Sequence, residues 1–209
     1  MSRVLPILFH TEMVRAILDG RKNCTRRICK DANEYAVPDM DFYNADKRTY
    51  AVHNFANREH SEQLSTAERT CPICPGDILY VRETWGYPIA LNSNEQYVFR
   101  ADEVAESGFK NDSHIWHSSI NMPKEAARIW LKVTNVRVER LQEITIDGIR
   151  NEGLSSMAVH AGDMEIAMEE WKNLWNSTVK KSDINHYGWD TNPLVWVIEF
   201  ERCEKPEGV

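Results

Sequence analysis

The sequence lacks a long apolar run. Near its start the apolar residues from Val4 to Phe9 are broken by Pro6. This run is too short for a secretory signal and far too short for a membrane span, which needs about 20 apolar residues. Five cysteines, an odd number without a secretory signal, indicate reduced thiols. We therefore expect a cytoplasmic protein without membrane contact.

The chain also lacks an excess of positive charge, internal repeats and low-complexity tracts. Its formal net charge is -7 over 209 residues, with 42% hydrophobic and 27% charged residues. These values are ordinary for a globular protein with one sizeable core. An acidic balance argues against a protein that coats long nucleic acid, because such binding neutralises many phosphates. It does not argue against a local basic pocket for one nucleotide or nucleoside.

One short stretch, GRKNCTRRICK from Gly20 to Lys30, concentrates positive charge around Thr25. Its cations are Arg21, Lys22, Arg26, Arg27 and Lys30. An amphipathic helix precedes the stretch, with Thr11 as a possible N-cap and Gly20 suited to a left-handed exit. We therefore expect residues 21–27 to form a loop or turn.

A turn brings Lys22 and Thr25 together, whereas in a strand their three-residue spacing sends them to opposite faces. A threonine hydroxyl becomes a nucleophile when a base accepts its proton, and a lysine can be that base when neighbouring cations lower its pKa. Arg21, Arg26 and Arg27 can supply those cations and can also bind an anionic or carbonyl-rich ligand. The alternative is that the cations form a solvated face.

Three strand candidates follow. In ILYVRETW, Glu83 and Trp85 fall on the apolar face, so we expect the Glu83 carboxylate to point at the core or into the mouth of a pocket. Between Ile129 and Arg140 the apolar residues shift from odd to even positions, as a bulge or barrel bend produces. A final alternating strand is expected over 194–201.

Two helices are expected in the second half of the chain. Thr145 can cap a short helix that ends at Gly153, which places Glu152 at its C-terminal end, where the helix dipole disfavours a carboxylate. Such a placement indicates a role elsewhere, although Glu83 and Glu152, each taken alone, are more often structural ion-pair partners. The second helix, over 163–178, has a continuous apolar stripe that includes two tryptophans.

Separated strands with few helices predict an α+β fold, a small and mostly antiparallel β-barrel with helices packed around it. We expect a single domain over residues 1–209. Residues 31–70 have little periodicity and are interpreted as an irregular insertion. A second polar stretch covers 102–119, and residues 203–209 are expected to be a flexible tail.

Two weaker signals concern metals and bases. Cys71 and Cys74 have the CxxC spacing of zinc sites, but no second CxxC accompanies them, so small residues in a tight turn are the favoured interpretation. We expect neither a metal nor a cofactor.

Trp171, Trp175 and Trp196 are assigned to the core by periodicity. Aromatic residues beside predicted loops can stack on a base; they are Trp85, Trp116, Tyr187 and Trp189.

Four motifs together resemble the ASCH domain family, which has a PUA-like barrel fold, and especially its longer bacteriophage and prophage members. They are GRKNCTRR after an amphipathic helix, PGDILYVRETW, the RNEGL helix and the closing strand VWVIEF. The similar regions are residues 1–30, 71–101, 116–154 and 187–202. Their order and spacing make the resemblance fairly specific.

The resemblance implies a cleft between sheet and helices and a link to nucleosides or RNA. Small ASCH proteins include amidohydrolases that remove the acyl group from N4-acetylcytidine. Their lysine, the threonine three residues later and a glutamate on a later short helix match Lys22, Thr25 and Glu152. In the implied mechanism Thr25 attacks the acyl carbonyl, Lys22 takes its proton, and Glu152 handles protons on the leaving amine and on water. The expected ligand is then a small nucleoside.

The chain departs from these small enzymes in its length, in the insertion over 31–70, and in the motif that carries Glu83 and Trp85. These two residues, with Arg21, Arg26 and Arg27, are our candidates for substrate binding. The alternative is a binding module for RNA or a modified nucleotide, or a ribonuclease in which Lys22 and the arginines stabilise phosphorane charge.

Overall fold

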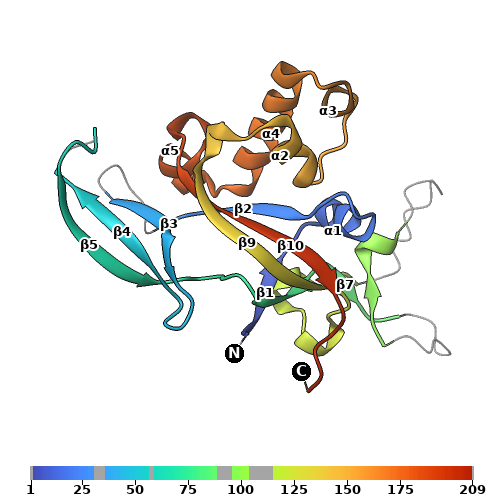
Figure 1. Cartoon of the computed structure of the whole chain (residues 1–209). Helices are drawn as coiled ribbons and strands as arrows, with labels where there is room; N and C mark the ends of the chain where they lie inside the picture. Colours follow the sequence, from blue (N-terminus) through green and yellow to red (C-terminus); the bar gives the residue numbers. More distant parts are fainter. Residues whose placement is uncertain (1, 31–35, 57–58, 89–95, 104–114, 209) are drawn as a thin grey trace.

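The computed structural model describes residues 2–30, 36–56, 59–88, 96–103 and 115–208. Its centre is a five-stranded sheet in the order β1-β6-β9-β10-β2 (Figure 1). The bounds are β1 Val4–Leu8, β6 Ile78–Arg82, β9 Trp130–Arg140, β10 Leu194–Cys203 and β2 Cys24–Ile28. β1 and β6 run parallel and the other neighbours antiparallel.

The fold is therefore α+β and mostly antiparallel, as the sequence predicts. Within the described ranges the strand pairing leaves this sheet open, with β1 and β2 at its edges, and no closed barrel is formed. β10 is predicted almost to its true length, since it reaches Cys203 rather than Glu201.

The helices of the second half cover one face of the sheet (Figure 1). They are α2 Ile146–Asn151, α3 Met157–Ala161, α4 Met164–Thr178 and α5 Ile184–Tyr187. Trp171 and Trp175 of α4 are buried in the same apolar cluster as Val195 and Val197 of β10. The predicted stripe of α4 is confirmed, apart from Met164, which is exposed. Trp196 is also in the core, on the opposite face of β10.

The other face packs against α1, Thr11–Leu18, and an arm of three antiparallel strands. The arm consists of β3 Ala36–Asn44, β4 Thr49–Phe55 and β5 Gln63–Thr70. The prediction of an irregular insertion over 31–70 is therefore wrong for these residues. Tyr50 anchors the arm, because its buried ring meets Trp196 edge-on at 5.0 Å. β5 is almost wholly exposed, so its hydrogen bonds to β4 form without the apolar alternation that marks a strand.

β9 contains the predicted irregularity. Val133 lies opposite Phe200 and Asn135 opposite Glu199, so Thr134 is the extra residue of a bulge. A bulge reverses the side-chain parity of the strand beyond it. Val133 before it and Val136 after it are consequently both buried.

Two local predictions around the basic stretch need correction. His10, not Thr11, occupies the N-cap position of α1, and its side chain makes no capping hydrogen bond. The expected loop over 21–27 is shorter, because β2 begins at Cys24 to pair with β10. Pairing with a buried central strand outweighs the polar character of this segment. Gly20 does adopt the left-handed exit, with φ of 75°.

The remaining elements are small. β7, Trp85–Gly86, pairs with β8, Val98–Phe99, and short 3-10 turns join the larger elements. Most of the polar stretch 102–119 lies outside the described residues. Among the described helices, none has the length and apolar character needed to cross a membrane.

Candidate functional site

The C-terminal end of α2 meets the segment before β2, at a bridge between Lys22 and Glu152. Thr145 begins α2 as predicted, since its hydroxyl accepts a hydrogen bond from the Gly148 backbone N–H at 3.1 Å. Gly153 then turns the chain with φ of 95°. A Cβ at Gly153 would lie 2.7 Å from the Ala16 side chain of α1. Glycine is therefore required for the close contact that brings Glu152 to Lys22.

The Lys22 ammonium is enclosed by three oxygen atoms. Nζ donates to Glu152 Oε2 at 2.6 Å, to the Glu152 carbonyl at 2.9 Å and to the Cys24 carbonyl at 2.7 Å. The side chains of Lys22 and Glu152 are 1% and 4% exposed. Three donors with three acceptors satisfy a protonated lysine completely. Its charge also offsets the unfavourable position of Glu152 at a helix C-terminus.

Arg26 extends this contact into a chain of alternating charges. It donates to Glu152 Oε1 at 3.3 Å and to Glu139 Oε2 at 3.1 Å. Arg137 in turn binds Glu139 Oε1 at 2.5 Å and also pairs with Glu199. We call these six side chains the ion-pair chain: Lys22, Arg26, Arg137, Glu139, Glu152 and Glu199. Its three cations and three carboxylates balance one another.

The ion-pair chain affects the groups beside it. Burial lowers the pKa of Arg137, but hydrogen bonds to Glu139 and Glu199 outweigh it, so the net shift is upward. Burial, followed by the charge of Glu152, raises the pKa of Cys24 to about 12. Cys24 is therefore a neutral thiol at physiological pH rather than a nucleophile.

Thr25 is buried in β2 and lies opposite Ile198 of β10. Because side chains alternate along a strand, Thr25 and Arg27 face one side of the sheet and Arg26 faces the other. The predicted turn is absent at Thr25, which lies in β2, and no hydrogen bond joins the described side chains of Lys22 and Thr25. Instead, Lys22 Nζ reaches the carbonyl of Cys24, whose peptide bond leads directly to Thr25. The ammonium thus lies beside the backbone that carries the candidate nucleophile.

Phe9 links Lys22 with the Thr25 face of β2. Lys22 Nζ lies 5.4 Å from the centre of its ring, and the Arg27 guanidinium carbon lies 5.3 Å from the same centre. Both distances are within the range of cation–π attraction. Lys22 is therefore at the edge of β2, between the face that holds Thr25 and the side on which Glu152 and Arg26 meet.

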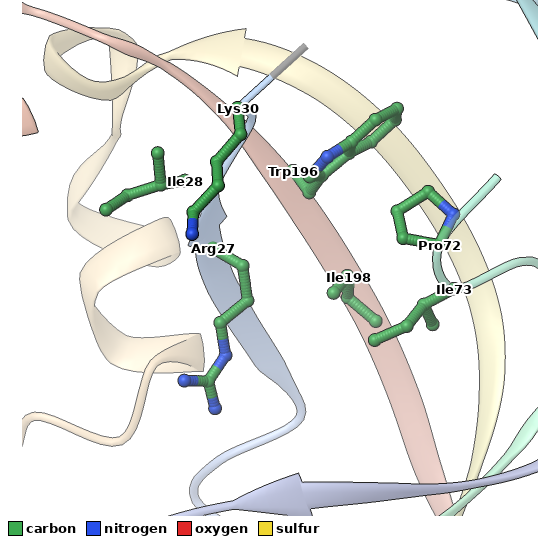
Figure 2. Close-up of a pocket in the computed structure, with 7 residues that line it drawn as sticks. All are labelled: Arg27, Ile28, Lys30, Pro72, Ile73, Trp196 and Ile198. Carbon is green, nitrogen blue, oxygen red and sulfur yellow. The ribbon is translucent and has the colours of Figure 1, made fainter. Parts of the chain in front are cut away.

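The other candidate arginines have different roles. Arg21 ion-pairs with Asp19 at 2.9 Å and donates to the Gly153 carbonyl at 2.8 Å, so it fastens α1 to the turn after α2. Arg27 donates to the Leu8 carbonyl at 2.8 Å, and burial lowers its pKa. Arg27 and Lys30 border a cavity of about 230 Å³ (Figure 2). Its other lining residues are Ile28, Pro72, Ile73, Trp196 and Ile198.

Glu83 and Trp85 belong to a second cluster. Both are buried, as their parity predicts. Glu83 receives two hydrogen bonds from Arg128, at 2.9 and 3.0 Å, and Arg128 also pairs with Asp102 at 2.7 Å. Burial raises the pKa of Glu83, and Arg128 offsets only part of the rise. In the described part of the chain, no hydrogen bond or ion pair joins Glu83 to Lys22 or Glu152.

This second cluster borders a cleft of about 540 Å³ whose lining includes Arg128 and Asp102. The Trp85 ring is packed among Tyr87, Tyr97 and His117, with ring centres 4.9 to 5.6 Å away. The structure therefore separates the candidate residues into two groups. Lys22, Thr25, Glu152 and the basic stretch form one, and Glu83 with Trp85 the other.

Cys71 and Cys74 lie fully buried in the tight turn before β6. Arg3 donates to the Cys71 carbonyl at 3.1 Å and to Cys74 Sγ at 3.5 Å, and burial raises the pKa of the Cys71 thiol. Among the residues with described positions, no three His, Cys, Asp or Glu side chains are grouped to hold a metal ion.

Sequence reasoning missed Glu139 and Glu199, which complete the ion-pair chain. One sequence feature could have indicated Glu139: Arg137 and Glu139 are two residues apart in β9, so their side chains lie on the same face of the strand and can pair. Their pairing with Glu199 depends on the register of β9 with β10, which the bulge sets.

Comparison of the chain with models of protein families, with curated proteins and with solved structures finds no match.

Proposed function

We propose that the chain is an amidohydrolase that removes the acyl group from an N4-acylated cytidine or a related nucleoside amide, like the ASCH proteins that its motifs resemble. The open five-stranded sheet is then a divergent form of the PUA-like barrel. The observation that supports the proposal most strongly is the buried 2.6 Å contact between Lys22 and Glu152, beside the strand that carries Thr25. These are the three positions that the resemblance selects.

In this proposal the first step is a proton transfer, and the hydrogen bonds of Lys22 support it. A protonated lysine has three N–H donors and no lone pair, so it cannot accept another proton. Lys22 must therefore pass a proton from Nζ to Glu152 Oε2, across their 2.6 Å contact, before it acts as a base. The transfer leaves a neutral amine and a carboxylic acid, the forms needed for nucleophile activation and for protonation of the leaving group.

Acyl transfer follows from these two groups. The Thr25 hydroxyl oxygen attacks the acyl carbon while its proton moves to the Lys22 amine. Glu152 gives its proton to the departing cytidine N4 as the C–N bond breaks, which leaves an ester on Thr25. Water then attacks the acyl carbon of this ester and gives one proton to Glu152. The bond between the acyl carbon and the Thr25 oxygen breaks, the acyl group leaves as its carboxylic acid, and Lys22 returns a proton to the Thr25 oxygen. Proton transfer from Glu152 to Lys22 restores the starting state.

Arg26 is a positioning residue in this scheme. It holds Glu152 Oε1 while Oε2 faces Lys22, so the carboxylate cannot rotate freely. Lys22, Thr25 and Glu152 are all buried, so substrate has to enter at the edge of the sheet where β2 ends the strand order. An edge strand can move aside with fewer broken backbone hydrogen bonds than a central one.

Chromatography of N4-acetylcytidine incubated with the purified protein tests the proposal. We expect conversion to cytidine by the wild type and none by Lys22→Ala, Thr25→Ala or Glu152→Ala. Loss in Lys22→Ala alone would exclude the threonine nucleophile and leave an electrostatic role for the lysine.

A second candidate function is the recognition of RNA or a modified nucleotide. It is favoured by Arg27 and Lys30, two cations at one cavity. The salt response separates the two functions, because a binder that neutralises several phosphates loses affinity steeply as salt rises. Hydrolysis of a neutral nucleoside should change little over the same salt range.

A further inference from the structure

The five cations of the basic stretch fall into two groups. Arg21, Lys22 and Arg26 each have a carboxylate oxygen within 3.3 Å. Arg27 and Lys30 form no ion pair with any residue whose position is described. Arg27 uses one guanidinium nitrogen on the Leu8 carbonyl. These two side chains therefore provide positive charge that has no direct carboxylate partner in the described part of the protein.

This charge lies beside an apolar wall. Trp196, Ile198 and Ile73 line the cavity of about 230 Å³ across from Arg27 and Lys30 (Figure 2). Arg27 and Lys30 come from β2 and its end, Trp196 and Ile198 from β10, and Ile73 from the turn before β6. An apolar wall with two cations at one side fits a ligand that has a flat apolar body and one anionic group.

The cavity is also next to the candidate nucleophile. Ile198 lies directly opposite Thr25, and Trp196 directly opposite Arg27. Residues opposite one another in a sheet have side chains on the same face, so Thr25 is the neighbour of the cavity wall. Thr25 is not itself a lining residue, but its cross-strand partner Ile198 is, so a ligand in the cavity lies on the same face of the sheet as Thr25.

The size of the cavity limits what it can hold. Pockets for drug-sized ligands measure about 300–1,000 Å³. A volume of about 230 Å³ suits one pyrimidine ring with its sugar partly outside, and it cannot enclose several nucleotides.

We propose that this cavity binds a single pyrimidine nucleoside monophosphate, with the base against Trp196 and Ile198 and the phosphate on Arg27 and Lys30. The substrate of the amidohydrolase is then an N4-acylated cytidine monophosphate rather than the free nucleoside. This choice of substrate rests on the proposed function, whereas the binding of the nucleotide does not.

Calorimetric titration with cytidine 5′-monophosphate and with cytidine tests the binding directly. A charge-assisted contact of the phosphate predicts that the nucleotide binds about 10- to 100-fold more tightly at low salt. Arg27→Gln and Lys30→Gln should each bring this ratio closer to one. Lys180→Gln, which removes the same charge from an exposed lysine after α4, is the matched control and should keep the ratio.

Equal affinities for the nucleotide and the nucleoside in the wild type would overturn the inference. Much tighter binding of a cytidine oligonucleotide than of the monophosphate would also overturn it, in favour of an RNA site. If Arg27→Gln disturbs the folding of β2, the Lys30→Gln variant still tests the inference, because Lys30 is exposed and its replacement should not affect folding.

Hydrolysis separates this inference from the proposed function. The ratio of kcat/KM for N4-acetylcytidine monophosphate to that for N4-acetylcytidine should equal about 10 to 100 in the wild type. Arg27-dependent nucleotide binding without hydrolysis of either compound would support the nucleotide site and contradict the amidohydrolase. Hydrolysis of both compounds at one rate, with equal affinities, would support the amidohydrolase and contradict the nucleotide site.

Discussion

Lys22 and Glu152 are separated by 130 positions in the chain, yet their side chains meet at 2.6 Å in a buried environment. The left-handed exit of α1 at Gly20 and the turn after α2 at Gly153 bring the two backbones together. Arg26 and Glu139 continue the contact along the helix-covered face of the sheet. A buried lysine with three acceptors is held in one position, as a proton-transfer group requires.

The first prediction concerns the stability of this pair. Glu152→Gln removes the charge that neutralises Lys22 and Arg26, so it should lower the free energy of unfolding by about 3–5 kcal/mol. Urea denaturation measures the change. Glu201→Gln is the control, because Glu201 faces Lys132 at 4.0 Å in an exposed pair. Its effect should stay within about 1 kcal/mol.

The double variant Lys22→Met with Glu152→Met extends this test. Replacing both partners removes the unpaired buried charge that either single replacement leaves. It should therefore be more stable than the sum of the two single effects predicts. Strict additivity would show that the two side chains do not interact.

Thr25→Val gives the second prediction. Valine keeps the β-branched shape that suits β2 but has no hydroxyl. We expect cytidine release from N4-acetylcytidine to be abolished, with a change in unfolding free energy of at most about 1.5 kcal/mol. Thr25→Ser should keep measurable activity because it retains the oxygen. An active Thr25→Val variant would show that this hydroxyl is not the nucleophile.

The third prediction concerns pH and Glu83. Burial raises its pKa above the ordinary value of 4.5, despite two hydrogen bonds from Arg128. At a pH between the ordinary pKa and the raised pKa, the Glu83 carboxyl group is protonated more fully in the folded state than in the unfolded chain. The contribution of Glu83 to stability should therefore fall as pH rises from 4.5 through the raised pKa. The measurement is the free energy of unfolding of wild type minus that of Glu83→Gln at several pH values, which should fall as pH rises. A wild type that gains stability relative to Glu83→Gln as pH rises would contradict the prediction.

Asp77 should behave in the opposite way, which is the fourth prediction. Burial alone would raise its pKa, but hydrogen bonds from the Arg3 side chain and from the backbone of Cys74 and Arg3 lower it below 3.8. Its stabilising effect is then present above 3.8 and is lost as pH falls through the lowered pKa. Denaturation of wild type and Asp77→Asn should show a difference that shrinks in acid. A constant difference would mean that Asp77 contributes packing but no charge.

Part of the fold follows from sequence patterns alone. The cap at Thr145, the stripe of α4 and the alternation of β10 are local signals, and the structure confirms them. The parity shift before Val136 predicts a bulge or a barrel bend, and the register of β9 with β10 shows that it is a bulge, with Thr134 as the extra residue. Each of these features depends on neighbours along the chain.

The remaining features depend on contacts between distant segments. β5 has almost no buried side chain, so its sequence carries no alternation to detect. β2 is a strand because β10 pairs with it, despite the polar residues of the basic stretch. Glu139 and Glu199 belong to the ion-pair chain because of the register between β9 and β10, which the sequence does not reveal. The sequence places Glu83 among the substrate-binding candidates, whereas in the structure Arg128 binds it in a separate cluster.

Mass spectrometry of the peptide that contains Thr25, after rapid acid quenching of the protein with N4-acetylcytidine, tests the central claim most directly. An acyl group on Thr25 that forms as cytidine is released, and that is absent in Lys22→Ala, is the predicted result. Release of cytidine with no acyl group on Thr25 at any quench time would contradict the threonine ester. If the folded wild type removed the acyl group from neither N4-acetylcytidine nor N4-acetylcytidine monophosphate, with no cytidine and no cytidine monophosphate formed, the amidohydrolase itself would be contradicted.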